Sequence, residues 1–222
     1  MSRGPVPARS EEPWIPDDDD WLRILRHVLT RECLRNQVLI LVCYDGALRR
    51  AECIALRVDD IDWAHCTITV RAATTKNGRR RVVALSRTTA QKLEEYVATE
   101  RTRLVAAYGG DAAGPLFLSE SYRNPGQPLT VWTFNDVMEK VRQAVGLPAL
   151  TPHTLRHLLA TDIVRGGLTL DEVGHYLGHA SLATTQLYVH RDTATVARRI
   201  RAATTWRDAQ VQRLIAKGRD DG

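Results

Sequence analysis

Residues 151–157 read TPHTLRH, in a segment whose spacing predicts a helix. His153 and Arg156 are three residues apart, so on a helix they share one face and can point at the same phosphate oxygen. His157 is four residues from His153, a spacing at which two imidazoles can also bind zinc. Zincins carry glutamate directly after the first histidine, however, and position 154 is threonine. The stretch therefore favours phosphate binding over zinc, with His157 as a supporting or structural residue.

A second stretch lies closer to the C-terminus. Residues 177–179 read LGH, and a lone Tyr188 follows within QLYVH. Glycine at a helix end allows a tight turn, which presents His179 either as a cap or as a hydrogen-bond donor to a developing oxyanion. A phenol has a pKa near 10 and needs activation to act as a nucleophile, so an isolated tyrosine is usually a half-buried aromatic. Beside two imidazoles and a guanidinium, Tyr188 becomes a candidate nucleophile for a phosphodiester.

The remaining parts of a phosphoryl-transfer site are found upstream. Residues 44–52, YDGALRRAE, predict a turn after a buried helix, with Arg49 at the head of the next helix. Glu52 lies three residues further on, and it either braces Arg49 or forms an ordinary surface ion pair. Lys76 lies in TTKNGR, a predicted hairpin tip, either as a solvated lysine or as a general acid that reaches a leaving oxygen.

Composition describes a globular protein with a basic surface. A chain of 222 residues is enough for one large domain or two small ones, with a core that needs no disulfide. It has no apolar run of membrane-spanning length and no signal peptide, so the cytoplasm is the expected location. The net charge is +5, and only four of the 31 basic residues are lysine. Arginine grips phosphate through two nitrogens, which fits a polyanionic partner, although a GC-rich genome also favours arginine.

Two other groups of residues have a metal-binding alternative. The four cysteines, at positions 33, 43, 53 and 66, are widely spaced and form no C-x-x-C motif, so buried thiols are favoured over a zinc site. Residues 17–20 are all aspartate and precede an apolar-periodic segment. They predict a helix N-terminus, because acids satisfy the free N–H groups there, and they lack the alternating spacing of an EF-hand calcium loop.

The periodicity of apolar residues predicts an α+β fold that is mostly helical. Residues 1–16 are proline-rich and predict a flexible tail or linker. Alternating or β-branched segments predict a small three-stranded antiparallel sheet from residues 58–61, 66–71 and 81–85, and Asn77-Gly78 marks a hairpin between the last two. Helices are predicted at residues 21–29, 35–44, 49–56, 88–108, 131–145, 152–165, 169–177, 182–187 and 194–216.

Taken together, residues 44–56, 74–85, 151–161 and 177–190 resemble the catalytic domain of the tyrosine recombinase (phage integrase) family, over roughly residues 17–200. The resemblance implies a catalytic set in the family's order, with Glu52 and His157 in support: Arg49, Lys76, His153, Arg156, His179 and Tyr188. One departure lies in the first motif, where the family usually has Thr-Gly-Leu-Arg and this chain has Gly-Ala-Leu-Arg at residues 46–49.

The resemblance implies a site-specific recombinase or integrase, of the kind found in mobile elements, that cuts and rejoins double-stranded DNA through a 3′-phosphotyrosyl intermediate. No metal or other cofactor is implied. The arginines would hold the scissile phosphate, Tyr188 would attack, Lys76 would protonate the leaving 5′ oxygen, and the histidines would assist. A type IB topoisomerase, a non-catalytic DNA-binding regulator and a zinc hydrolase are the alternatives. The target sequence, and the choice among integration, excision, resolution and transposition, stay open.

The resemblance also implies a domain organisation. Residues 17–222 would form the catalytic domain, and the N-terminal core-binding domain of the family would be absent, so that a partner protein would supply it unless the chain is a truncated form. A homotetramer on DNA is the expected assembly. The predicted C-terminal helix at about 194–216 carries apolar residues amid arginines and would either dock on a neighbouring protomer or pack against its own domain.

Overall fold

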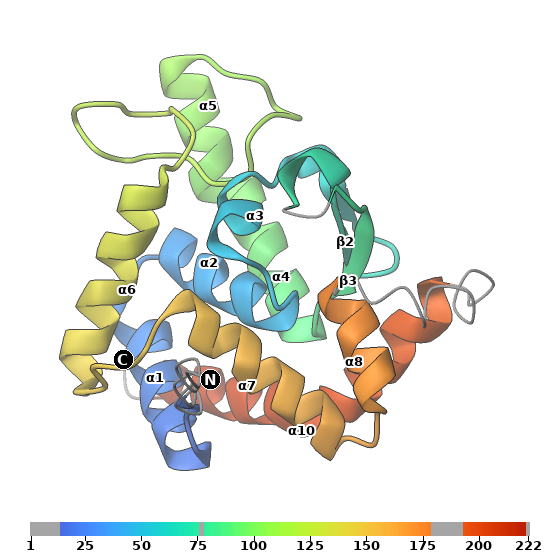
Figure 1. Ribbon diagram of the computed structural model, residues 1–222. Coiled ribbons are helices and arrows are strands. Elements are labelled where there is room, and N and C mark those ends of the chain that lie inside the picture. The colour runs from blue at the N-terminus through green and yellow to red at the C-terminus, as the bar shows by residue number, and fades with distance from the viewer. Residues whose placement is uncertain (1–13, 76–77, 179–192, 221–222) are drawn as a thin grey trace, which may run out of the picture.

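The computed structural model describes residues 14–75, 78–178 and 193–220, with side chains from 195 to 217 in the last stretch (Figure 1). The described part is mainly helical with one small sheet, which confirms the predicted α+β class. The α-helices are α1 (Asp18–Arg31), α2 (Leu34–Asp45), α3 (Arg50–Ile54), α4 (Arg87–Tyr96), α5 (Thr102–Tyr108), α6 (Val131–Val145), α7 (Pro152–Arg165), α8 (Leu170–Leu177) and α10 (Thr193–Asp220). The predicted helix at 182–187 lies outside the described residues.

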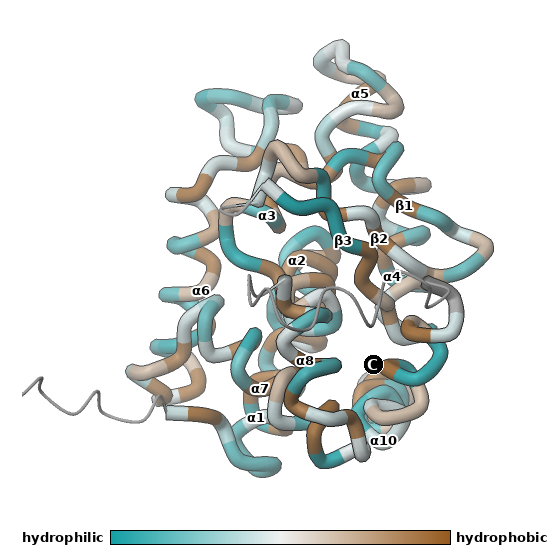
Figure 2. Tube along the Cα trace, turned by 45° about the vertical axis from the view of Figure 1, so that its right-hand side comes forward, coloured by the Kyte–Doolittle hydropathy of each residue, from teal (hydrophilic) through white to brown (hydrophobic). Residues whose placement is uncertain are grey.

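Helix α2 forms the centre of the core. It is apolar almost all round, nearly all of it is buried, and it lies near the middle of the molecule in Figure 2. Helices α1, α4 and α7 pack against it. Helix α1 contributes a stripe at helical spacing, in which Trp21 packs against Tyr44 with ring centroids 4.6 Å apart and the ring planes tilted by 34°. Its N-terminus is capped by Asp17, whose carboxylate accepts the Asp20 N–H at 2.8 Å, so the predicted acidic helix start is confirmed.

The sheet has the antiparallel order β1 (Ile61–Asp62), β2 (Thr67–Val70) and β3 (Arg81–Ala84), with Ile68 opposite Val83. The prediction of a strand at 58–61 is largely wrong. Residues Val58–Asp60 form a 3₁₀ turn, since the Asp60 carboxylate accepts the Arg57 N–H at 2.8 Å and closes the chain on itself. Only Ile61 of that segment joins the sheet.

The predicted hairpin is confirmed as the pairing of β2 with β3, but residues 71–80 join the strands rather than a two-residue turn. The connection begins with a 3₁₀ turn, η2 (Ala72–Thr74), and passes through Gly78 at φ +64°, whose N–H bonds the Thr75 carbonyl at 3.2 Å. This backbone requires a left-handed residue, which glycine adopts without steric cost. Asn77 lies outside the described residues.

Other boundaries differ less. Helices α6 and α7 begin and end at the predicted residues. The predicted helix at 88–108 is interrupted by a π-helical segment, η3 (Val97–Arg101), between α4 and α5. Cys43 and Cys53 are buried free thiols as predicted, whereas Cys33 is exposed and Cys66 half-buried because neither lies on a core-facing position. No helix within the described ranges is long and apolar enough to span a membrane.

Helix α10 crosses the base of the molecule beside α1, α7 and β3 (Figure 1). Its Arg207 is only 1% exposed and pairs with Asp162 of α7 through two hydrogen bonds of 2.9 and 3.0 Å. The same carboxylate accepts the Tyr44 hydroxyl at 2.7 Å, and Arg207 also lies 2.9 Å from Asp18 of α1. These contacts bind α10 to its own domain, and docking on a neighbour stays a prediction.

Candidate active site

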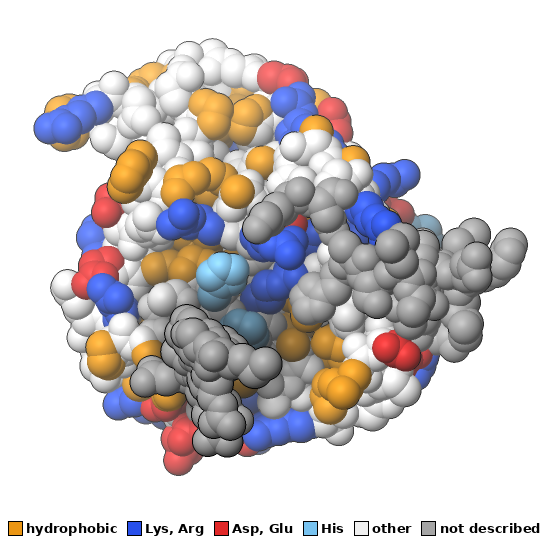
Figure 3. Space-filling view, in the orientation of Figure 1, with side chains coloured by type: hydrophobic (Ala, Val, Ile, Leu, Met, Phe, Trp, Pro, Cys, Tyr) orange, Lys and Arg blue, Asp and Glu red, His pale blue; other side chains and the backbone are white. Residues whose placement is uncertain are grey.

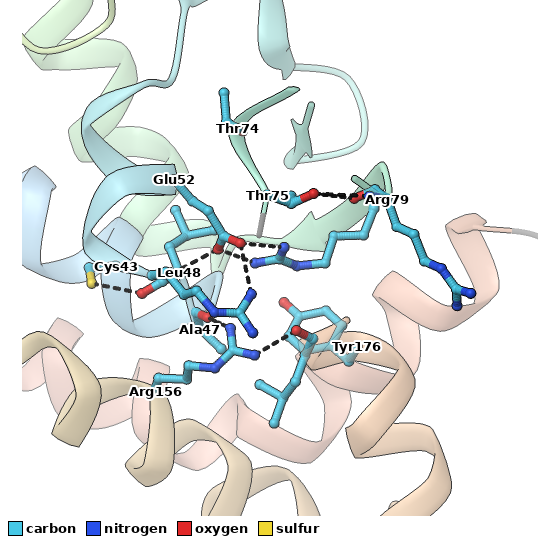
Figure 4. Close-up of polar contacts among 12 residues, drawn as sticks. Cys43, Ala47, Leu48, Glu52, Thr74, Thr75, Arg79, Arg156 and Tyr176 are labelled. Atoms are coloured by element: carbon cyan, nitrogen blue, oxygen red, sulfur yellow. Dashed lines mark hydrogen bonds and ion pairs between the residues drawn. The ribbon is translucent and has the colours of Figure 1, made fainter. Parts of the chain in front are cut away.

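The described part of the site is centred on the turn between α2 and α3. This turn places Arg49 at the N-cap of α3, and the Ala47 carbonyl of the same turn accepts a hydrogen bond from Arg156 of α7 (Figure 4). Of the predicted set, the structure brings Arg49, Glu52 and Arg156 together. The other predicted catalytic residues at positions 76, 179 and 188 lie outside the described residues.

Glu52 is the anionic centre of this group. It is 1% exposed, and it accepts the Arg49 backbone N–H at 2.9 Å and the Arg49 guanidinium at 3.0 Å. The predicted hydrogen bond is therefore present, and it is buried on the glutamate side rather than on the surface. Arg81 of β3 adds a two-pronged ion pair to the same carboxylate, at 3.0 and 2.6 Å. Burial would raise the pKa of Glu52, but the hydrogen bonds and charge of Arg81, then those of Arg49, outweigh it and lower the pKa.

Arg81 is a member of the site that the sequence did not reveal. It lies 29 residues from Glu52, so no local spacing connects the two. The sequence does contain a weak signal, because Arg81 begins the strand that follows the Lys76 loop. A carboxylate has two oxygens, so Glu52 can pair with a second arginine besides Arg49. With Arg81 included, three guanidiniums surround one carboxylate.

Arg156 is held by backbone rather than by an acid. Its side chain is nearly buried, and its terminal nitrogens donate to the carbonyls of Ala47 and Leu177, each at 2.5 Å. Burial, followed by the charges of Arg49 and Arg81, lowers the pKa of Arg156 to about 10. The group still carries its proton at neutral pH. It is thus a buried cation whose charge the carbonyls orient but do not neutralise.

The backbone of the turn is strained at Ala47. Its φ is +44°, in the left-handed region that costs a residue with a Cβ about 1–2 kcal/mol. The motif that residues 46–49 resemble has glycine at this position, and the structure supplies the reason, since glycine enters that region freely. The alanine nevertheless keeps Arg49 in register and turns its own carbonyl toward Arg156.

His153 and His157 lie one turn apart on α7, both exposed, with ring centroids 6.5 Å apart. Partial burial of the ring, then the charges of His153 and Arg156, lowers the pKa of His157. Figure 3 shows histidine side chains beside Lys and Arg side chains near the middle of this face. Within the described ranges, no three His, Cys, Asp or Glu side chains gather in a metal-binding arrangement.

This geometry suits an anion with several oxygens. Three guanidiniums and one carboxylate leave a surplus of two positive charges in a partly desolvated site, where a phosphate would replace the missing counter-charge. The exposed histidines border the same site and can donate or accept protons. Such a set can bind a phosphodiester and stabilise charge that develops on its oxygens.

Comparison with known proteins relates this chain to the phage integrase family. The model of the phage integrase family matches residues 17–195. The tyrosine recombinase XerC of Roseiflexus sp. (strain RS-1) is 35% identical over 185 residues, which is 83% of this chain and 56% of that protein. The tyrosine recombinase XerA of Pyrococcus horikoshii is 32% identical over 158 residues, 70% of this chain and 50% of that protein. The chain thus spans about half the length of the curated relatives it matches.

Solved structures show the same fold. The crystal structure of XerA recombinase superposes with a TM-score of 0.64 at 24% identity, and the match covers 89% of this chain and 66% of that one. The XerH site-specific recombinase bound to its palindromic difH substrate, in a post-cleavage complex, gives a TM-score of 0.62 at 23% identity over 87% of this chain and 52% of that one.

Proposed function

The chain belongs to the phage integrase family, and from this premise we propose that it is a tyrosine site-specific recombinase that breaks and rejoins DNA strands. The observation that carries the proposal is the surplus of arginine charge around Glu52. Arg156, held by two carbonyls, and Arg49, braced by Glu52, are oriented before any ligand arrives. A site ordered in this way stabilises a developing negative charge without having to reorganise during the reaction.

The proposed reaction is a transesterification at the scissile phosphate. The Tyr188 phenol oxygen attacks phosphorus, the bond to the 5′ oxygen breaks, and the products are a 3′-phosphotyrosyl link and a 5′-hydroxyl. Arg49 and Arg156 bind the non-bridging oxygens, and His179 donates a further hydrogen bond to them. His153 assists the removal of the phenol proton, and Lys76 protonates the departing 5′ oxygen.

Rejoining uses the same residues in reverse. The covalent link conserves the energy of the phosphodiester bond, so the 5′-hydroxyl of another strand can displace the tyrosine without ATP. Neither a metal ion nor an organic cofactor has a step in this scheme. His157 lies one turn from His153 on α7, and its proposed role is to support that residue rather than to bind the phosphate.

Double-stranded DNA is the proposed substrate and partner. Two XerH structures that resemble this chain are complexes with the difH substrate, and we carry that partner over as part of the proposal. Exchange between two duplexes would use a homotetramer on DNA, and a second protein would supply a core-binding domain if this chain acts without one. Residues 17–222 would serve as the catalytic domain in that assembly.

A nicked suicide DNA substrate tests the proposal. The nick lets a short 5′ fragment diffuse away after cleavage, so the covalent protein–DNA adduct accumulates and is seen on a denaturing gel. We expect the adduct with the wild-type chain and none with Tyr188→Phe. Tyr122→Phe is the matched control, because Tyr122 is 84% exposed on a loop and should leave adduct formation unchanged.

Two results would contradict the scheme. If Tyr188→Phe still forms the adduct, the nucleophile is a different residue. If EDTA abolishes cleavage and Mg²⁺ or Zn²⁺ restores it, the reaction depends on a metal and the proposed metal-free mechanism is wrong.

A further inference from the structure

One buried hydroxyl, that of Tyr176, links the two segments whose carbonyls hold Arg156, the turn after α2 and the end of α8. Tyr176, on the last turn of α8, is 3% exposed, and its hydroxyl donates to the Asp45 carbonyl at 2.9 Å. The same oxygen accepts the Ala84 N–H of β3 at 3.0 Å. The phenol therefore joins the end of α2, the edge of the sheet and the end of α8 at a single atom.

These bonds form a ring with those of Arg156. The guanidinium bridges the carbonyls of Ala47 and Leu177, and the phenol of Tyr176 bridges to Asp45. Asp45 is two residues before Ala47, and Tyr176 is the neighbour of Leu177. The same two segments are thus connected twice, once by the guanidinium and once by the phenol.

The third bond extends the ring to the other arginines. Ala84 lies on β3 three residues after Arg81, which pairs with Glu52, which in turn braces Arg49. Strand β3 ends the sheet order, and the Tyr176 hydroxyl satisfies the Ala84 N–H on its open edge. Burial raises the pKa of this phenol far above its ordinary value, so the hydroxyl keeps the proton it donates.

We propose that Tyr176 is a positioning residue that fixes the distance between the two carbonyls that orient Arg156. The inference rests on the proposed function, because the reaction it affects is phosphotyrosyl formation. Without the hydroxyl, the Arg156 guanidinium alone bridges the carbonyls of Ala47 and Leu177, and the distance between them is less tightly fixed. A small displacement of a group that positions the substrate, of about 1 Å or less, slows the chemical step about 10- to 100-fold while substrate binding changes little.

The test is a single-turnover measurement on the full chain with saturating suicide substrate. A folding defect lowers the amplitude of adduct formation, since fewer molecules are active, whereas a positioning defect lowers the rate constant of those that are. For Tyr176→Phe we expect a rate constant about 10- to 100-fold lower and DNA affinity within about threefold of wild type. Tyr96→Phe is the matched control, because Tyr96 is equally buried and its hydroxyl accepts one backbone N–H, from Leu118, away from the site.

Two further variants separate positioning from stability. Replacing Tyr176 with para-aminophenylalanine keeps a donor at the same ring position, and it should restore the rate. In an Arg156→Lys background, where the ammonium cannot bridge two carbonyls in the same way, Tyr176→Phe should have little additional effect.

The inference is overturned by a Tyr176→Phe rate constant within twofold of wild type, or by the same fold-loss in both backgrounds. Failure of the wild-type chain to form any adduct would instead refute the proposed function. The two failures are therefore distinguishable.

Discussion

Two buried arginines, Arg156 of α7 and Arg207 of α10, are hydrogen-bonded in different ways. Arg207 binds the Asp162 carboxylate through two nitrogens, and Asp18 lies at the edge of the same group. Arg156, one and a half turns before Asp162 on the helix, binds only carbonyls and faces Arg49 and Arg81 across a single carboxylate. The charge of Arg207 is balanced by carboxylates, whereas the region around Arg156 keeps a net positive charge.

The difference separates a structural use of arginine from a functional one. A buried guanidinium paired with a carboxylate has its desolvation cost offset by the ion pair, and it holds elements together. A buried guanidinium among like charges raises the free energy of the folded state unless an anion binds. Arginine thus serves folding at position 207 and the proposed chemistry at position 156, and substitutions at the two positions should have different effects on stability and on cleavage.

The largest expected effect is the loss of cleavage in Arg156→Ala. Removing a preorganised donor to a developing oxyanion should slow adduct formation about 100- to 1000-fold. Stability should change little, because the surplus charge is relieved as the hydrogen bonds are lost. The measurement is the single-turnover rate on suicide DNA together with urea unfolding. A rate near wild type would place the phosphate elsewhere.

Arg207→Ala should show the opposite pattern. It leaves Asp162 buried without its partner, so we expect a loss of about 3–5 kcal/mol in the free energy of unfolding. The cleavage rate of the molecules that remain folded should be close to wild type. Arg198→Ala, an exposed change on the same helix, controls for the loss of charge and should lie within about 0.5 kcal/mol of wild type. A cleavage defect without a stability defect would contradict the division.

Asp45 lies between the two regions and gives a pH-dependent prediction. Burial raises its pKa to about 6, Asp208 of α10 adds to this, and hydrogen bonds from Ser86 and Thr89 oppose it. Because the folded pKa exceeds the unfolded one, the unfolded state binds fewer protons between these values, and stability should fall as pH rises from about 4 to about 6.

The matching variant is Asp45→Asn, whose side-chain oxygen can still accept the Ser86 N–H. We expect it to remove this pH dependence and to raise the free energy of unfolding at pH 7.5 by about 1–3 kcal/mol. Thermal unfolding of both proteins across pH 4 to 8 measures it. Parallel curves for the two proteins would show that Asp45 is ionised throughout.

The smallest effect is expected for Ala47→Gly. Glycine relieves the left-handed strain but loses more entropy on folding, so the net gain should be about 0.5–1 kcal/mol, with cleavage within about twofold of wild type. The control is Gly46→Ala, whose added Cβ would approach a Leu48 side-chain carbon at 2.8 Å and should destabilise the turn. Thermal unfolding of the two variants measures the change in stability. A loss of stability in Ala47→Gly would mean that the turn is not strained at this residue.

Local patterns predicted the helices well and the long-range contacts poorly. Helices α6 and α7 have clear apolar periodicity between strong turn signals, and their boundaries were predicted to the residue. The segment 58–61 has strand-like β-branched residues, but the Asp60 side chain competes for the backbone and forms a 3₁₀ turn. A side chain that bonds its own backbone is invisible to periodicity.

The site shows the same limit. The spacing of three residues predicted the Arg49–Glu52 contact, whereas Arg81 and Tyr176 join the site across 29 and 131 residues. The resemblance supplied the order of the predicted catalytic residues, but it could not show that carbonyls orient Arg156. Those acceptors belong to the backbone, and any residue at positions 47 and 177 would carry them.

The ion pair between Arg207 of α10 and Asp162 of α7 also affects when the domain can fold during synthesis. Asp18, Tyr44 and Asp162 are all synthesised before Arg207. Asp18 and Asp162 both pair with Arg207, and Tyr44 donates to Asp162. Until α10 leaves the ribosome, the Asp162 carboxylate would have the Tyr44 hydroxyl as a partner but would lack the Arg207 guanidinium. The domain should therefore reach its native state only after residue 207 has left the ribosome, and the earlier helices should form a less ordered intermediate that chaperones can bind.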